Sequence, residues 1–115
     1  MSLRLKSRKL DNVVVIDMGG RLTSGEPQLL FRNTIHRFLE DGTNRFVLNL
    51  SDVSYIDSSG LGELAVTKSA LDNKGGRVNL LGLQKRVNDV LVLTKLACVF
   101  DFFDEESKAV AALRG

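Results

Sequence analysis

Two adjacent serine hydroxyls are the groups of this chain best placed to carry chemistry. They lie between a carboxylate and two glycines in the run Asp57-Ser58-Ser59-Gly60-Leu61-Gly62. A serine hydroxyl in such a setting can act as a catalytic nucleophile, cap a helix or accept a phosphoryl group, and closely spaced glycines are typical of loops that bind phosphates. The elements around the two serines, and the residues elsewhere in the chain, decide between these roles.

The serines follow a predicted buried strand and open a predicted helix. The apolar run Phe46–Leu50 has the length of a strand, and the residues after the serines are apolar at helical spacing, at Leu61, Leu64 and Leu71. The junction is therefore a helix N-terminus. Its free backbone N–H groups and the positive end of the helix dipole favour an anion or a phosphorylated hydroxyl there.

Glycine is a poor residue for the first turns of this helix. Gly60 and Gly62 each cost up to about 1 kcal/mol relative to alanine in a helix interior. We therefore expect their small size to serve either a tight turn or the close approach of another backbone or of a partner.

Three enzyme classes can be tested against this junction. Gly60–Ala65 formally matches the dinucleotide-binding pattern G-x-G-x-x-A, but Val78–Gly82 lacks the acidic residue expected about twenty residues further on. A serine hydrolase is not supported, because no G-x-S-x-G is present and the only histidine, His36, precedes the serines. The phosphate-binding G-x-x-x-x-G-K-[ST] is also absent, and no residues have metal-ligand spacing.

The sequence thus predicts no catalytic residue, no metal and no cofactor. Local physics alone favours a plain structural role, in which one serine caps the helix and the glycines shape the turn.

Composition describes an ordinary globular protein of one domain. The 115 residues are 43% hydrophobic and 26% charged, and the formal charge of +2 is too small to indicate nucleic acid or an anionic membrane as a partner. The lone Cys98 lies in an apolar run and is expected in the core. The chain has neither a signal-peptide pattern nor 18 consecutive apolar residues, so we expect a cytoplasmic protein without direct membrane contact.

Hydrophobic periodicity predicts the order strand, strand, helix, strand, helix, strand, helix, strand, helix. The first two strands cover residues 3–9 and 13–18, with a hairpin turn between them, and Gly19-Gly20 ends the second. A hydroxyl of Thr23 or Ser24 caps the first helix, whose apolar stripe is Leu30, Phe31, Ile35, Phe38 and Leu39.

The remaining elements follow the serine junction. The second helix is expected to end near Asn73, and a strand covers 78–81. A third helix starts near Gln84, with Leu93 or Thr94 as its last inward residue. Residues 99–103 form the last strand, and the last helix begins at 104–106. This alternation predicts a mainly parallel sheet covered by helices.

Several segments of the chain resemble those of one protein family. Val47–Leu50, followed by Val53–Gly62, resembles the signature of the STAS family, the domain shared by bacterial anti-sigma factor antagonists and sulfate transporters. Gly75–Leu80 and Val87–Leu96 are similar to the family's next strand and helix. The resemblance implies one STAS domain over residues 1–115, an α/β fold with a central mixed, mainly parallel sheet of about five strands and about four helices packed against it.

The resemblance also implies a function, that of the anti-sigma factor antagonist branch. Such proteins bind an anti-sigma factor that is also a serine kinase, and this binding releases a sigma factor. The kinase phosphorylates the first hydroxyl after the motif aspartate, which is Ser58 here, and a phosphatase of the PP2C type reverses the reaction. Asp57 and Ser59 would flank that site, and Gly60, Leu61 and Gly62 would shape the partner-binding surface.

One position departs from the pattern of the branch. Many antagonists carry G-x-[LI]-D after the second strand, and the acid helps to build the partner surface, whereas this chain has Gly20-Arg21-Leu22-Thr23. Thr23 is thus an expected partner-binding residue without the usual charge. Two alternatives stay open: a STAS adaptor subunit of a membrane transport or signalling assembly without phospho-switching, and a small nucleotide-binding module.

Overall fold

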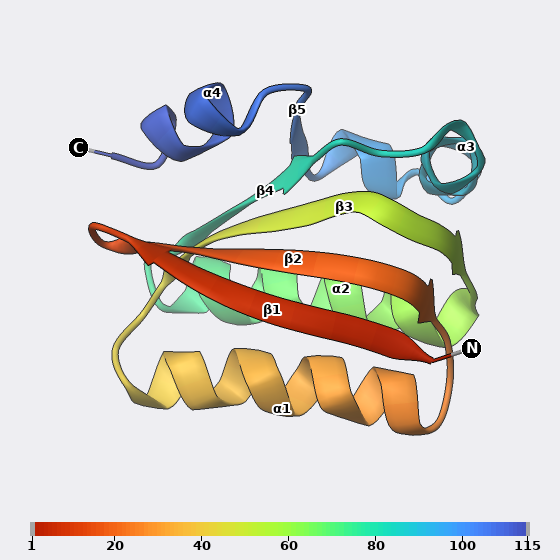
Figure 1. The fold of residues 1–115 in the computed structure, drawn as a ribbon, viewed down its shortest axis with the longest axis horizontal. Helices are drawn as coiled ribbons and strands as arrows, with labels where there is room; N and C mark the ends of the chain where they lie inside the picture. The colour runs from red at the N-terminus through yellow and green to blue at the C-terminus, as the bar shows by residue number, and fades with distance from the viewer. Residues whose placement is uncertain (1, 115) are drawn as a thin grey trace.

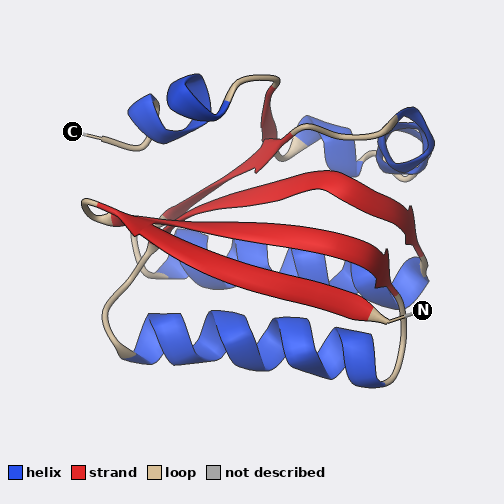
Figure 2. Cartoon of the chain, in the orientation of Figure 1, coloured by secondary structure: helices blue, strands red, loops and turns tan. Residues whose placement is uncertain are grey.

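A five-stranded sheet with helices on both faces forms the protein, as seen in a computed structural model that describes residues 2–114 (Figures 1 and 2). The elements are β1 (Leu3–Leu10), β2 (Val13–Leu22), α1 (Glu26–Glu40), β3 (Arg45–Ile56), α2 (Ser58–Asn73), β4 (Arg77–Leu81), α3 (Lys85–Leu93), the 3₁₀ turn η1 (Leu96–Cys98), β5 (Asp101–Phe103) and α4 (Glu106–Ala111). The predicted order of strands and helices is confirmed.

The sheet is mixed and mainly parallel, as expected. Its strand order is β1-β2-β3-β4-β5; β1 runs antiparallel to β2, and the other neighbouring pairs are parallel. The β1–β2 hairpin closes at Asp11, which adopts a left-handed conformation with φ of 58°. Each parallel pair is joined through a helix, so the carboxyl ends of β2 and β3 lie at the same edge of the sheet, where α1 and α2 begin.

Alternation along the strands divides the core between the two faces of the sheet. Val14 and Ile16 of β2 belong to the larger apolar cluster, which contains the buried residues of α1, α2 and α3, whereas Val13 and Val15 belong to a smaller cluster with α4. This period of two is the pattern that a strand buried on both faces produces.

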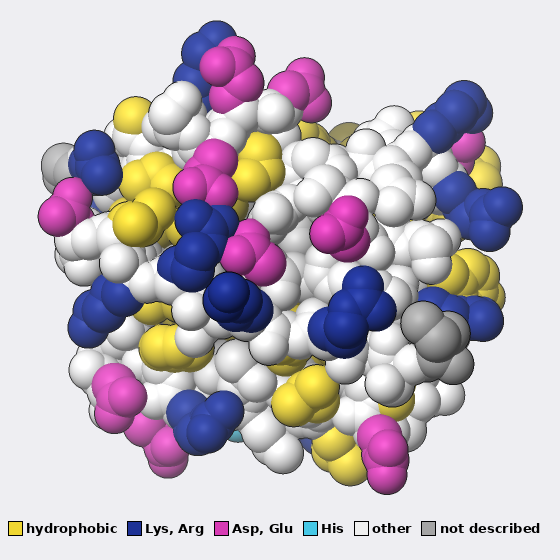
Figure 3. All heavy atoms as spheres, in the orientation of Figure 1, with side chains coloured by type: hydrophobic (Ala, Val, Ile, Leu, Met, Phe, Trp, Pro, Cys, Tyr) yellow, Lys and Arg dark blue, Asp and Glu magenta, His cyan; other side chains and the backbone are white. Residues whose placement is uncertain are grey.

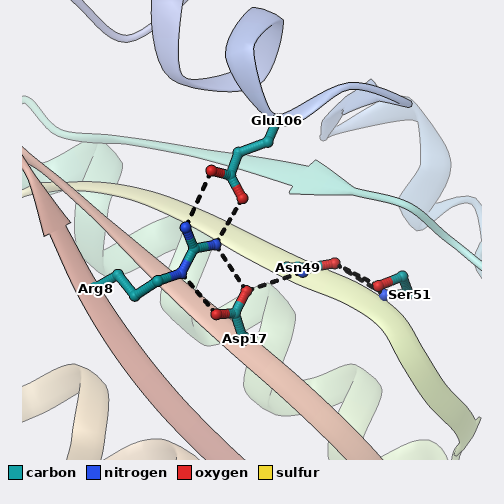
Figure 4. Close-up of polar contacts among 5 residues, drawn as sticks. All are labelled: Arg8, Asp17, Asn49, Ser51 and Glu106. Carbon is teal, nitrogen blue, oxygen red and sulfur yellow. Dashed lines mark hydrogen bonds and ion pairs between the residues drawn. The ribbon is translucent and has the colours of Figure 1, made fainter.

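The short helix α4 is held on its face of the sheet by polar contacts at both ends. At its start, Arg8 of β1 forms two hydrogen bonds to Glu106 at 2.6 and 3.0 Å and two to Asp17 at 2.7 and 2.9 Å (Figure 4). Asn49 of β3 extends the network by donating to Asp17 at 2.9 Å and accepting from Ser51.

At the other end of α4, strand side chains donate to backbone carbonyls that lack helical partners. Arg77 donates to the carbonyl of Ala112 at 3.0 Å, and Arg45 donates to that of Leu113. A six-residue helix is too short to be stable alone, so these contacts and the burial of Val110 keep it in place.

The predicted end of the second strand at Gly19-Gly20 is wrong. The strand β2 continues through both glycines to Leu22, because Gly19 and Gly20 pair with β1 on one side and, with register irregularities, with β3 on the other. Gly20 has a φ of 93°, and a side chain there would overlap the backbone carbonyl of Ser2. The glycines therefore permit an irregular strand instead of ending it.

The predictions for the segment after α3 are also partly wrong. Lys95 has a left-handed φ of 65° and turns the chain into η1, so only Asp101–Phe103 forms the last strand. Cys98 is exposed instead of buried, and Leu93 and Thr94 point outward, with Leu93 82% exposed. The apolar run that suggested a core strand here is a turn in which only Phe100 is fully buried.

Candidate functional site

The Asp57 carboxylate organises the site at the carboxyl ends of β2 and β3. Asp57 is the N-cap of α2, and its Oδ1 accepts a hydrogen bond from the Gly60 N–H at 2.9 Å. Its Oδ2 accepts from the Ser24 N–H at 3.0 Å, in the loop between β2 and α1. One side chain thus both starts the helix and joins the two loops of the site.

These hydrogen bonds also keep Asp57 ionised. The Gly60 N–H is the main cause that lowers the pKa of Asp57 below its ordinary value, and the Ser24 N–H adds to the effect. The carboxylate therefore carries a negative charge next to Ser58 at neutral pH.

The predicted hydroxyl caps are wrong for both helices. Asp57 caps α2, so Ser58 and Ser59 are its first two residues. For α1 the N-cap is Gly25, without a side-chain hydrogen bond, and the backbone of Ser24 is used to bind Asp57. A helix cap therefore does not explain the serine hydroxyls: Ser58 is exposed and Ser59 half-buried.

The two glycines of the motif have different surroundings. Gly60 is buried, and a methyl group there would overlap the Leu22 carbonyl oxygen and lie 2.9 Å from the side chains of Leu22 and Ile56. Gly62 is exposed, and a methyl group there would meet open space. The lack of a side chain at Gly60 thus lets α2 approach the end of β2. At Gly62, one turn after Ser58, no side chain projects from the exposed surface of the helix, so this surface is flat.

The other predicted partner-binding residues lie in the first turn of α2 and in the β2–α1 loop. Leu61 is buried at 9% exposure and anchors the first turn of α2 in the core. Thr23 is half-buried in the β2–α1 loop, next to Ser24. The structure thus brings the motif and the β2–α1 loop together, with Ser58 and Gly62 exposed on the helix side.

The model of the STAS domain family matches residues 4–109 of this chain. The chain is a member of the STAS domain family.

Relatives of this STAS domain include named regulators. A Staphylococcus aureus protein named anti-sigma-B factor antagonist is 30% identical over 97 residues, which cover 84% of this chain and 88% of the relative. A Thermotoga maritima protein with the provisional name of anti-sigma factor antagonist is 30% identical over 105 residues, which cover 91% of this chain and 93% of the relative.

Solved structures have the same fold. The crystal structure of a Thermotoga maritima protein with that provisional name has a TM-score of 0.89 at 30% identity, over 96% of this chain and 95% of the other. The anti-sigma factor antagonist SpoIIAA in its unphosphorylated form has a TM-score of 0.77 at 23% identity, over 99% of both chains. Its phosphorylated form, from Bacillus, has a TM-score of 0.76 at 22% identity, over 96% of this chain and all of that one.

Sequence reasoning missed a stacked pair beside the site of this STAS domain. Arg21 and Tyr55 are register partners in β2 and β3, and the guanidinium carbon of Arg21 lies 4.7 Å from the centre of the Tyr55 ring. Both side chains are exposed. An arginine and an aromatic residue near the ends of neighbouring parallel strands could have indicated this contact.

Sequence reasoning also missed a buried carboxylate between α1 and α2. Glu63 is 4% exposed and accepts hydrogen bonds at 2.9 Å from both Gln28 and Arg32 of α1. Burial by itself raises the pKa of Glu63, but these donors together lower it below its ordinary value. The resulting ion pair fixes α1 against α2 next to the motif.

Neither a metal-ligand cluster nor a membrane-spanning helix is present within residues 2–114. Across residues 2–114, no three His, Cys, Asp or Glu side chains are grouped closely enough to hold a metal ion, and His36 is exposed. None of the helices in that range has the length and apolar character needed to cross a membrane.

Proposed function

We propose that this STAS domain is an anti-sigma factor antagonist that is switched off by phosphorylation of Ser58. The observation that carries the proposal is the exposed Ser58 at the first position of α2, beside the flat surface at Gly62. The names of the Staphylococcus aureus and Thermotoga maritima relatives support the class of function. The partner is an anti-sigma factor with serine kinase activity, and a PP2C-type phosphatase resets the switch.

When Ser58 of this domain is unphosphorylated, the anti-sigma factor packs over the start of α2 and the β2–α1 loop. This surface is lined by Ser58, Ser59 and Gly62 of α2 and by Thr23 of the loop. Its backbone is positioned by Asp57, Gly60 and Leu61. Binding releases a sigma factor from the anti-sigma factor. The domain itself performs no catalysis and works in the cytoplasm, away from nucleic acid and membrane.

Phosphorylation acts on the interface by charge. A phosphoryl group on Ser58 adds about −1.5 to −2 charges at neutral pH, next to a carboxylate that is already ionised. The free N–H groups of the helix N-terminus tolerate this dianion in the free protein. In a complex the same charge would be buried without a partner, and a cost of about 3 kcal/mol already weakens binding by about two orders of magnitude.

The test is a capture experiment with wild-type, Ser58→Ala and Ser58→Glu baits in lysate of the source organism, followed by mass spectrometry. We expect wild type and Ser58→Ala to retain a kinase-like anti-sigma factor and Ser58→Glu to release it. The matched control is Ser69→Glu, which adds the same charge at an exposed position of α2 outside this surface and should leave binding unchanged.

Direct phosphorylation completes the test. The purified kinase should transfer phosphate from ATP to wild type but not to Ser58→Ala. Equal retention of a transporter or scaffold subunit by all baits would reject the switch and favour an adaptor subunit, in agreement with the uncharged Thr23.

A further inference from the structure

The free edge of β1 borders a groove that the proposed switch does not use. β1 is the end strand of the sheet, paired only with β2 in the part of the chain that is described, and α1 runs along its open side (Figure 1). Between them lies a groove of about 420 Å³, lined by Leu5, Ser7, Leu30, Thr34, Arg37, Phe38 and Asp41. Its volume is in the range of about 300–1,000 Å³ typical of ligand pockets.

Three of the residues that line the groove, Leu5, Leu30 and Phe38, can contact apolar side chains, beside the polar Ser7, Thr34, Arg37 and Asp41. Leu30 is 42% exposed on the side of α1 that faces β1, although its periodicity predicted a core residue. Leu5 and Phe38 are half-buried beside it. The Thr34 hydroxyl already donates to the Leu30 carbonyl at 2.8 Å, so it requires no polar partner from outside.

The opposite face of β1 carries cations. Successive side chains of a strand alternate between faces, so Arg4, Lys6 and Arg8 lie together on the side away from the groove. The space-filling view shows Lys and Arg side chains spread over β1 on the face turned toward the viewer (Figure 3). Arg8 is engaged by Asp17 and Glu106. Arg4 and Lys6 are exposed, and neither forms an ion pair within 4 Å among residues 2–114, although Lys6 lies opposite Asp17 and helps to lower the pKa of that carboxyl.

We propose that the β1 edge binds an extended peptide segment of another protein as a sixth strand. Main-chain hydrogen bonds to β1 supply affinity, as in other cases of strand addition. Alternate apolar side chains of the peptide enter the groove at Leu5 and Leu30, and the acidic side chains between them face Arg4 and Lys6. No residue of this surface belongs to the Ser58 site, so the inference is independent of the proposed switch.

The charges of β1 favour an acidic partner over a second copy of this chain. Antiparallel pairing of two β1 strands would place Arg4, Lys6 and Arg8 opposite the same cations of the other copy. Like charges directly opposite each other destabilise a strand pair, and basic residues on edge strands are a common protection against self-association. The same residues attract a strand of opposite charge.

A labelled eight-residue peptide of alternating valine and glutamate is the probe. We expect saturable binding by fluorescence anisotropy, and at least tenfold weaker binding of a peptide in which lysine replaces glutamate. Two further peptides carry N-methyl groups on alternate residues, one on the odd and one on the even positions. Strand addition predicts that one of them loses at least tenfold in affinity while the other keeps it, because only one set of N–H groups faces β1.

Surface variants locate the site. The double variant Arg4→Glu/Lys6→Glu should prefer the lysine peptide, and Leu30→Asp should weaken binding of the glutamate peptide at least tenfold. The control Lys74→Glu changes an exposed cation in the turn after α2 and should leave affinity unchanged. Thermal unfolding of each variant verifies that it is folded.

Three results would overturn the proposal. They are no saturation of the glutamate peptide below about 1 mM, equal affinity of the two methylated peptides, and a charge preference that the double variant leaves unchanged. A concentration-dependent dimer of the wild-type protein that Leu30→Asp abolishes would assign the edge to a second copy instead.

Discussion

At the scale of single residues, Gly60 and Gly62 have the same place in the motif but opposite structural roles. Gly60 is packed against Leu22 and Ile56, whereas Gly62 borders open space. Alanine at position 60 should lower the free energy of unfolding by about 1–3 kcal/mol, because its methyl group forces α2 away from the end of β2. Urea denaturation of the purified variant measures this difference.

The matched variant Gly62→Ala should act in the other direction. It removes a helix-breaking residue without a clash, so we expect a gain of about 0.5–1 kcal/mol in unfolding free energy. If Gly62 lies in the partner interface, the same variant still weakens partner binding. Equal stability changes at both positions would contradict the packing described for Gly60.

The charge of Asp57 gives a prediction of pH dependence. Its pKa in the folded protein is below the value of about 3.9 expected in an unfolded chain, so its ionised form stabilises the fold above about pH 5, and this contribution is lost as pH falls through the folded pKa. Asp57→Asn keeps an N-cap but removes the charge. We expect it to be less stable than wild type by about 0.5–1 kcal/mol at pH 7.

Unfolding curves of the two proteins from pH 7 to pH 2.5 measure the effect. Their difference should shrink below about pH 4. A difference that stays constant over this range would mean that the carboxylate charge does not contribute. Asp57→Ala, which removes the cap itself, serves as the reference for full loss of the interaction.

At the scale of elements, the strongly periodic segments were predictable from the sequence. The hairpin, the buried strand β3 and the end of α2 near Asn73 follow from apolar runs and turn residues, and these are local signals. The STAS signature implied the fold, which is confirmed, and a set of site residues, which stays a prediction. The contacts that join separate elements, such as Arg8 to Glu106 across 98 positions, leave no local signal.

The errors have specific physical causes. Gly19 and Gly20 are strand-ending residues by propensity, but pairing with β3 on one side and β1 on the other overrides it. Serine is a good N-cap, but Asp57, one position earlier, takes that role because its carboxylate also binds Ser24. The apolar residues around Cys98 predicted a core position, but the left-handed turn at Lys95 leads this segment along the surface.

The attachment of α4 can be tested at Arg8. Arg8→Ala leaves Asp17 and Glu106 without their shared partner, and the pKa of each carboxyl should return toward its ordinary value. The three side chains are 31–38% exposed, so water screens the interaction and we expect a loss of only about 1 kcal/mol at pH 7. Amide exchange should accelerate more in α4 than in α2, since α4 opens first.

The control for this prediction is Lys85→Ala. Lys85 pairs with Asp89 four residues later, but its side chain is 88% exposed, so its removal should leave the stability unchanged. The effect of Arg8→Ala should also shrink as pH falls below the ordinary pKa values of the two carboxyls, about 4, and disappear as pH falls through their lower pKa values in the folded protein. Uniform acceleration of exchange across the whole protein would contradict a local attachment.

At the scale of the whole molecule, the proposed switch and the proposed peptide-binding edge lie in different regions of the fold. Ser58 lies at the carboxyl ends of β2 and β3, where α2 begins. The helix α4 covers part of the other face of the sheet, and the edge of β1 is unpaired on one side within residues 2–114. A switch that works by burying charge in the interface requires that the fold itself is insensitive to the added charge. Otherwise, loss of partner binding would report unfolding.

The last prediction is therefore that phosphorylation at Ser58 leaves the fold intact. Phosphoserine placed there during synthesis lowers the formal charge from +2 to about zero. Attraction to the helix N-terminus and repulsion from Asp57 oppose each other, so the unfolding free energy should change by less than about 1 kcal/mol. Phosphoserine at Ser69, an exposed position inside the same helix, is the control and should destabilise more, because no free N–H groups lie there. If the Ser58 form is instead the less stable one by several kcal/mol, the switch works by unfolding α2 and not by burying a charge in the interface.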